Sequence, residues 1–255
     1  MRRYVALGSS MAAGPGIAPR AAGAPRWSGR SASNYPHLVA ERCGLELTDV
    51  TFSGATTAHL LTDRQHDAPP QLSTLEGSES LVTVTIGGND VGYVPLLIAA
   101  TLPRAVRRLP LVGARISALL DPAARDRALG EVFDSLCAVG RESRRRAPQA
   151  RIFFVDYLTL LPPEGIEAPP LSPADADLGR HVAAALERLT GDAAAATGCE
   201  IVRAAAASRE HHAWSAQPWT TKPAKYVVSL PGRPAPLHPN AAGMRAVAEL
   251  ISAQL

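Results

Sequence analysis

Short apolar runs alternate with longer amphipathic stretches along most of this sequence. Five of these runs predict β-strands, and they cover residues 4–7, 47–52, 81–86, 151–156 and 200–204. The clearest are 81–86 and 151–156, which are nearly continuous in apolar and β-branched residues. Such runs are typical of parallel strands that are buried on both faces of a sheet.

Helices are predicted between these strands. The spacing of apolar residues places them at 33–43, 125–146, 172–197 and 239–255. The alternation of strands and helices predicts an α/β fold with three layers, in which a parallel sheet of about five strands carries helices on both faces. The sequence has no internal repeat and no linker long enough to divide it, so we expect a single domain over residues 1–255.

The segment 93–127 departs from this alternation. It contains Pro95, Pro103, Pro110 and Pro122 among apolar and arginine residues. Because proline interrupts helices and strands, we expect a helical insertion of short elements at about 93–127. This insertion is either a wall or lid that faces the substrate, or ordinary packing over the sheet edge.

Composition and charge exclude several classes of partner. The chain has 255 residues and can bury a core without disulfides or a structural metal. Its formal net charge of +3 is too small to indicate a nucleic-acid partner. The residues 104–151 hold eleven Arg against five Asp and Glu, a local charge of +6. That segment is either a solvated helix face or a surface that attracts anionic lipid or an anionic substrate.

Targeting and cofactor signals are absent from the sequence. The cysteines Cys43, Cys137 and Cys199 are odd in number and lack metal-ligand spacing, which favours a reduced, cytoplasmic protein. The apolar run 4–7 is too short for a signal peptide, and no run is long enough to span a membrane. Without phosphate-binding or dinucleotide glycine motifs, and without spaced metal ligands, we expect neither an organic cofactor nor a metal.

Small and polar residues follow the first three predicted strands, where open parallel sheets bind their ligands. Ser10 follows the first strand, Gly54 the second and Asn89 the third, and His238 precedes the last helix. A serine hydroxyl needs a base to act as a nucleophile, and the tetrahedral intermediate needs donors aimed at its oxyanion. We therefore predict Ser10 as nucleophile, His238 as general base, and Gly54 and Asn89 in the oxyanion hole.

The ordered set of segments resembles the SGNH (GDSL) hydrolase family, and most closely its actinobacterial-type esterases and lipases. The four blocks of the family are matched by Gly8-Ser9-Ser10, by 53–57, by 87–90 and by His238-Pro239-Asn240, with Gly243 following. They span nearly the whole chain. The resemblance implies a flavodoxin-like fold and a serine esterase or lipase acting on small-molecule carboxylic esters.

Two positions depart from the family pattern. Ser9 replaces the aspartate before the nucleophile, and Ala235 stands where the acid of the triad is usual, three residues before His238. Because the acid mainly fixes the tautomer and orientation of the imidazole, a carbonyl is able to replace it. We predict a Ser10–His238 dyad oriented by the backbone carbonyl of Ala235, and a structural role for Asp90.

Two alternatives to ester hydrolysis stay open at this point. The missing acid at Ala235 is compatible with a non-enzymatic binding protein on the same fold, and an acyl group is also transferable to an acceptor other than water. For the substrate pocket, we expect Trp214, Trp219 and Tyr226 as walls, with loop packing as the other interpretation. The sequence leaves the oligomeric state open.

Overall fold

The core of the structure is a five-stranded sheet in which every neighbouring pair of strands is parallel. The computed structural model describes residues 2–107, 109, 112–224 and 232–255. The strand order is β2-β1-β3-β4-β5. The strands are β1 (Arg2–Gly8), β2 (Leu45–Asp49), β3 (Glu79–Thr85), β4 (Arg151–Val155) and β5 (Glu200–Val202). The predicted α/β fold is thus confirmed.

Strand β2 begins and ends earlier than the sequence pattern predicts. The segment 50–52 nevertheless still follows β1, since the Val50 and Phe52 amides donate to the carbonyls of Ala6 and Gly8 at 3.0 and 2.9 Å. Residues 50–52 thus stay bonded to β1 up to the carboxyl end of the sheet, although β2 itself ends at Asp49. The loop that contains Gly54 therefore begins beside the end of β1.

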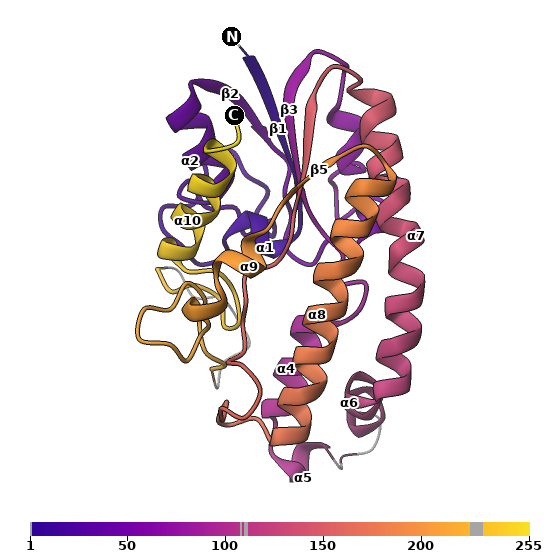
Figure 1. Ribbon diagram of the computed structural model, residues 1–255, viewed down its shortest axis with the longest axis vertical. Helices are drawn as coiled ribbons and strands as arrows, with labels where there is room; N and C mark the ends of the chain where they lie inside the picture. Colours follow the sequence, from indigo (N-terminus) through magenta and orange to yellow (C-terminus); the bar gives the residue numbers. More distant parts are fainter. Residues whose placement is uncertain (1, 108, 110–111, 225–231) are drawn as a thin grey trace.

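Long helices cover both faces of the sheet (Figure 1). Helices α7 (Pro122–Arg146) and α8 (Pro173–Ala196) pack against one face, which presents alternate residues of β1 such as Val5 and Leu7. Helices α2 (Tyr35–Cys43) and α10 (Ala241–Ser252) cover the other face. Alternate strand residues point to opposite faces, so each strand contributes to both cores.

Local capping fixes where these helices begin. Ser172 accepts a hydrogen bond from the Asp175 amide at the start of α8. Helix α7 begins three residues before the predicted position 125, because Asp121 caps it and Pro122 occupies its first turn. Helix α10 begins after Asn240, whose side chain accepts from two amides.

The predicted insertion consists of short helices. They are α4 (Tyr93–Thr101), α5 (Arg104–Arg107) and α6 (Val112–Leu120), and they lie together at the lower end of the molecule in Figure 1. Helix α4 packs closely on α8, where a Cβ at Gly179 would come within 2.7 Å of Leu97. In the described part of the chain, no helix is both long and apolar enough to cross a membrane.

The carboxyl ends of the strands carry the remaining short elements. These are α1 (Ser10–Ala13), α3 (Thr57–Leu61), η1 (Gln71–Thr74), α9 (Ala204–Ala207) and η2 (Arg209–His211). Strands β1 and β3 approach tightly at this edge, because a Cβ at Gly8 would lie 2.5 Å from the Thr85 carbonyl oxygen. Only glycine fits there, at a φ of +147°.

Candidate active site

Ser10 is fixed at the carboxyl end of β1 by bonds to the backbone before it. The amide side chain of Gln71 accepts from the Gly8 N–H at 2.7 Å and donates to the Gly8 carbonyl at 3.1 Å. The Ser9 N–H donates to the Thr85 carbonyl at 2.9 Å. Ser10 therefore begins α1 directly after two residues, Gly8 and Ser9, whose backbone is held by hydrogen bonds.

The imidazole of His238 lies against the Ser10 hydroxyl. Its Nε2 atom is 2.8 Å from Ser10 Oγ, although the two residues are 228 positions apart. Its Nδ1 atom is 2.7 Å from the carbonyl oxygen of Pro236. Since a carbonyl only accepts, we assign the ring proton to Nδ1, which leaves the Nε2 lone pair to accept from the serine hydroxyl.

Burial lowers the pKa of His238 below its ordinary value of 6.5, while the bond to the Pro236 carbonyl acts in the opposite direction. The neutral imidazole is the form that is able to take a proton. Lowering this pKa therefore keeps the base available near neutral pH.

The predicted orienting carbonyl is one residue away from the observed one. The Ala235 carbonyl accepts from the Thr221 hydroxyl at 2.6 Å, and the Pro236 carbonyl faces the ring instead. The reason is the turn at Leu237, a buried residue with a φ of +59°, which reverses the chain directly before His238. The prediction of Ala235 was therefore wrong by one peptide unit.

Thr221 was not predicted as part of the site, yet it fixes the histidine loop. Its N–H donates to the His238 carbonyl at 2.9 Å, and its carbonyl accepts from the Leu237 N–H at 3.2 Å. Its hydroxyl also accepts from the His238 N–H at 3.2 Å. Thr221 lies in an irregular loop without periodic pattern, so the sequence offered no signal for this role.

Three potential donors belong to residues that line the cleft together with Ser10. In the described residues, neither the Ser10 N–H nor the Gly54 N–H has an acceptor within the protein. The Asn89 side-chain amide donates one hydrogen to the Ala55 carbonyl at 2.7 Å and keeps the second available. Ser10, Gly54, Asn89 and His238 line one cleft of about 610 Å³. The structure thus brings the four predicted residues together.

Asp90 and Tyr157 connect the loops that carry these donors. The Asp90 carboxylate accepts from the Thr57 N–H at 3.0 Å and from its hydroxyl at 2.5 Å, as expected for a structural residue. The hydroxyl of Tyr157, which was not predicted, accepts from the Gly88 N–H at 2.9 Å and lies 3.4 Å from Ser9 Oγ. Burial raises the pKa of Tyr157 to about 12, so the phenol stays neutral.

Two different walls bound the cleft. Helix α4 of the insertion contributes the apolar side chains Val94, Pro95 and Ile98. The facing wall comes from the loop 15–30, which contributes Ile17, Arg20, Arg26, Trp27 and Arg30. Helix α4 of the insertion therefore lines the cleft, and the substrate-facing role of the insertion stays a prediction.

The aromatic residues expected in the pocket lie elsewhere. Trp214 donates through Nε1 to the Pro169 carbonyl at 3.2 Å, and Trp219 stacks on His211 with ring centroids 4.0 Å apart. Neither belongs to the residues that line the cleft in the described part of the chain, so loop packing was the correct interpretation. Tyr226 lies outside the described residues. In the residues that are described, no group of three His, Cys, Asp or Glu is placed to hold a metal.

Comparison with known proteins agrees with this geometry. The model of the GDSL-like lipase/acylhydrolase family matches residues 6–246. The chain belongs to this family. Lipase 2 of Streptomyces coelicolor, a similar protein, is 34% identical over 255 residues, covering 96% of this chain and 83% of its own length. The resemblance noted in the sequence is confirmed, and as a GDSL-like lipase/acylhydrolase the chain is a carboxylic ester hydrolase.

Solved structures share the fold of this GDSL-like lipase/acylhydrolase. The phospholipase A1 of Streptomyces albidoflavus NA297 superposes with a TM-score of 0.81 at 24% identity, covering 100% of this chain and 99% of that one. The extracellular lipase of Streptomyces rimosus gives a TM-score of 0.78 at 24% identity and the same coverage. At this identity the likeness establishes the three-layer architecture.

Proposed function

We propose that this protein hydrolyses carboxylic esters of lipids with Ser10 and His238 as a dyad, in which the Pro236 carbonyl orients the imidazole. The observation that carries the proposal is the chain of contacts from Ser10 Oγ to His238 Nε2 at 2.8 Å and from Nδ1 to the Pro236 carbonyl at 2.7 Å. This is the arrangement that activates a serine hydroxyl, with a carbonyl in the place of the acid.

The reaction follows from the position of each group. His238 takes the proton of Ser10 as the serine oxygen attacks the acyl carbonyl, and a tetrahedral intermediate forms. The N–H groups of Ser10 and Gly54 and the Asn89 amide hold its oxyanion. His238 then gives the proton to the departing alcohol, which leaves an acyl-serine. Water attacks this ester with His238 as base, and the carboxylic acid is released.

The apolar wall favours an acyl chain as the group bound beside Ser10. Val94, Pro95 and Ile98 project from one helix and offer a continuous hydrocarbon surface within the cleft. The 34%-identical relative is named a lipase, which agrees with this wall. We place the acyl chain along α4 and the alcohol part toward the loop 15–30.

A fluorophosphonate probe tests the nucleophile. We expect covalent labelling of the wild-type protein at Ser10, located by mass spectrometry of the labelled peptide, and no labelling of a Ser10→Ala variant. Ser9→Ala is the matched control, since Ser9 is buried and contacts Tyr157 instead of the base. An unlabelled Ser10 in the folded wild-type protein would favour a binding protein without catalysis.

A panel of p-nitrophenyl esters of increasing chain length tests the substrate class. We expect kcat/KM to rise with chain length, and the Ile98→Trp variant to lose this preference because its larger side chain fills the apolar wall. Product analysis with added alcohols separates hydrolysis from acyl transfer. Equal rates for acetyl and long-chain esters in both proteins would exclude the assignment of the α4 wall to an acyl chain.

A further inference from the structure

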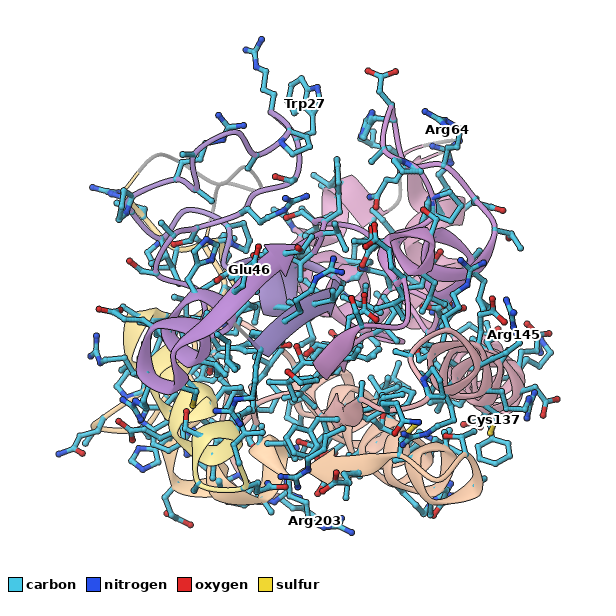
Figure 2. The ribbon with its side chains drawn as sticks, turned by 90° about the horizontal axis from the view of Figure 1, so that it is seen from above. Trp27, Glu46, Arg64, Cys137, Arg145 and Arg203 are labelled. Carbon is cyan, nitrogen blue, oxygen red and sulfur yellow. The ribbon has the colours of Figure 1, made fainter. Side chains whose placement is uncertain are left out.

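An exposed tryptophan stands at the rim of the catalytic cleft. Among the described residues with large apolar side chains, Trp27 is the most exposed, at 64%. The Arg26 guanidinium lies over its ring, 5.3 Å from the centroid. Figure 2 shows Trp27 at the outer edge of the molecule, away from the sheet and the long helices. An indole placed there is open to a partner outside the protein.

The same loop is cationic. The first 40 residues contain no Asp or Glu, and the loop 15–30 carries Arg20, Arg26 and Arg30. All three line the cleft, whose described lining includes no acidic side chain. Arg20 and Arg26 are exposed and have no carboxylate partner among the described residues. The mouth of the cleft is therefore positive on the side of Trp27.

The Arg-rich segment 104–151 does not line the cleft in the described part of the chain. Arg107 pairs with Asp175 at 3.3 Å, and Arg145 and Arg146 both pair with Glu142 at 2.6 Å. Arg144 donates to two backbone carbonyls. Because the cationic loop lines the cleft and this segment does not, the loop is the better site for an anionic partner that faces the cleft.

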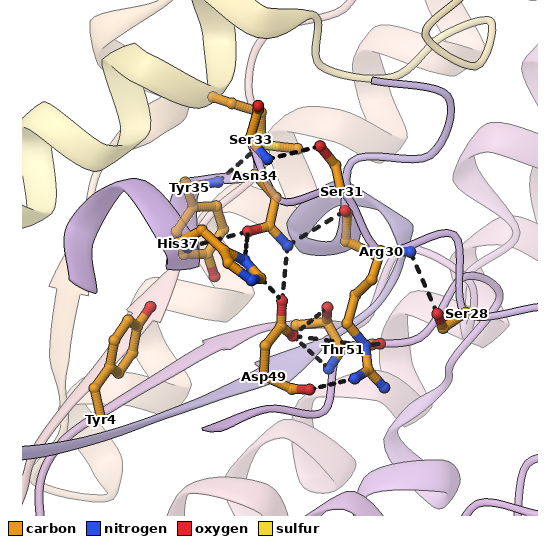
Figure 3. A network of polar contacts seen from close by, with 12 residues as sticks. Tyr4, Ser28, Arg30, Ser31, Ser33, Asn34, Tyr35, His37, Asp49 and Thr51 are labelled. Carbon is orange, nitrogen blue, oxygen red and sulfur yellow. Dashed lines mark hydrogen bonds and ion pairs between the residues drawn. The ribbon is translucent and has the colours of Figure 1, made fainter. Parts of the chain in front are cut away.

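Hydrogen bonds fix this loop to the segment that carries Gly54. The Ser28 carbonyl accepts from the Ser53 N–H at 2.8 Å and from its hydroxyl at 2.9 Å. Arg30 donates through Nε to the Thr51 carbonyl at 2.8 Å and also contacts Asp49, as Figure 3 shows. A partner that binds the loop 15–30 therefore also fixes how the cleft is oriented relative to that partner.

We propose that Trp27, Arg26 and Arg20 bind an anionic phospholipid surface. The indole enters the interface between headgroups and acyl chains, and the two guanidinium groups contact phosphates, which are the roles that such side chains favour at lipid surfaces. The cleft then opens directly onto the lipid. This inference rests on the proposed function in one respect, namely that the bound lipid supplies the ester substrate.

Vesicle flotation with the Ser10→Ala variant tests the proposal without turnover. Vesicles made of equal parts phosphatidylcholine and phosphatidylglycerol are expected to bind the protein at low salt and to release it at high salt. Binding to pure phosphatidylcholine vesicles is expected to be weaker by at least about tenfold. Trp27→Ala, and Arg20→Ala combined with Arg26→Ala, are each expected to weaken binding to the mixed vesicles by about tenfold.

Arg203→Ala is the matched control, because Arg203 is exposed at the edge opposite Trp27 in Figure 2. It is expected to bind as the parent does. Circular dichroism confirms that each variant is folded. Equal binding to both vesicle types, or equal losses for Arg203→Ala and the loop variants, would overturn the proposal. Vesicle binding is measured with a variant that lacks the proposed nucleophile, so its result does not depend on catalysis. Probe labelling tests the proposed function separately.

Discussion

Burial makes His238 a base with a lowered pKa, and this predicts the acid side of the pH profile. In the proposed mechanism, activity requires the neutral imidazole and is lost when it is protonated. We expect kcat/KM on a soluble ester to fall with an apparent pKa below 6.5, so activity persists at a lower pH than an exposed histidine allows. A steady-state pH series measures this. An acid limb above 6.5 would contradict the burial argument.

Asn89 contributes one free amide hydrogen beside Ser10, and its removal tests the oxyanion hole. We expect Asn89→Ala to lower kcat by roughly 10²–10³ with a small change in KM, because the donor acts on charge that develops after binding. Thermal unfolding of the variant checks that the lost bond to Ala55 leaves the fold intact. An unchanged kcat would remove Asn89 from the reaction.

Side chains and backbone differ in how well the sequence predicts them. Ser10, Gly54, Asn89 and His238 were predicted because each follows a strand or precedes a helix in a recognisable block. The Pro236 carbonyl was missed by one residue, since its direction depends on the dihedral angles of Leu237. Trp27 was also missed, because it lies in a loop without periodic pattern.

The loop that carries His238 is held by Thr221. We therefore predict that removing the Thr221 hydroxyl lowers activity and that a variant that keeps a hydroxyl retains it. Thr221→Val removes the bonds to the Ala235 carbonyl and to the His238 N–H. We expect kcat/KM to fall roughly tenfold through misplacement of the base, with the acid limb of the pH profile unmoved. Thr221→Ser keeps the hydroxyl and is expected to retain most of the activity. Equal activity in Val and Ser variants would refute this positioning role.

At the end of β4, the buried Asp156 predicts a pH-dependent stability. One carboxyl oxygen accepts from the Ala205 N–H at 2.7 Å, and the other has no partner among the described residues. Burial raises the pKa of Asp156 from 3.8 to about 7. The folded state then binds more protons at Asp156 than the unfolded one between these values, so the contribution of Asp156 to stability is greatest at acid pH and declines toward neutrality.

Asp156→Asn tests this, because the amide stays neutral at every pH. Relative to wild type, the variant is expected to gain on the order of 2–4 kcal/mol in unfolding free energy between about pH 4 and about pH 8. Urea titrations at both pH values measure the difference, in which any packing cost of the amide cancels. The same effect at both pH values would mean that Asp156 does not titrate in this range.

Strands and long helices were predicted well, and their ends less well. Apolar periodicity reports burial, which is continuous through β3 and α8 and therefore easy to recognise. The ends depend on single bonds, as at Asp121 before α7, where a cap and a proline start the helix before its apolar stripe begins. The insertion is a similar case, because its last predicted residues belong to α7.

For the molecule as a whole, the three cysteines predict that stability is independent of reductant. Cys43, Cys137 and Cys199 are all free. We expect the same midpoint of thermal unfolding with and without dithiothreitol. A lower midpoint under reduction would indicate a disulfide between these residues. The cytoplasmic location expected from the sequence stays a prediction, which cell fractionation tests.

The acceptor that orients His238 is part of the main chain, and this has a consequence for mutagenesis. Every residue encoded at position 236 has a backbone carbonyl, so alanine scanning does not remove the acceptor of the His238 ring. Variants at this position report only on the shape of the turn. Testing the acceptor requires synthetic chemistry, such as replacing the peptide link between Pro236 and Leu237 by an ester, whose carbonyl oxygen is a poorer acceptor. This change also removes the Leu237 N–H that donates to the Thr221 carbonyl.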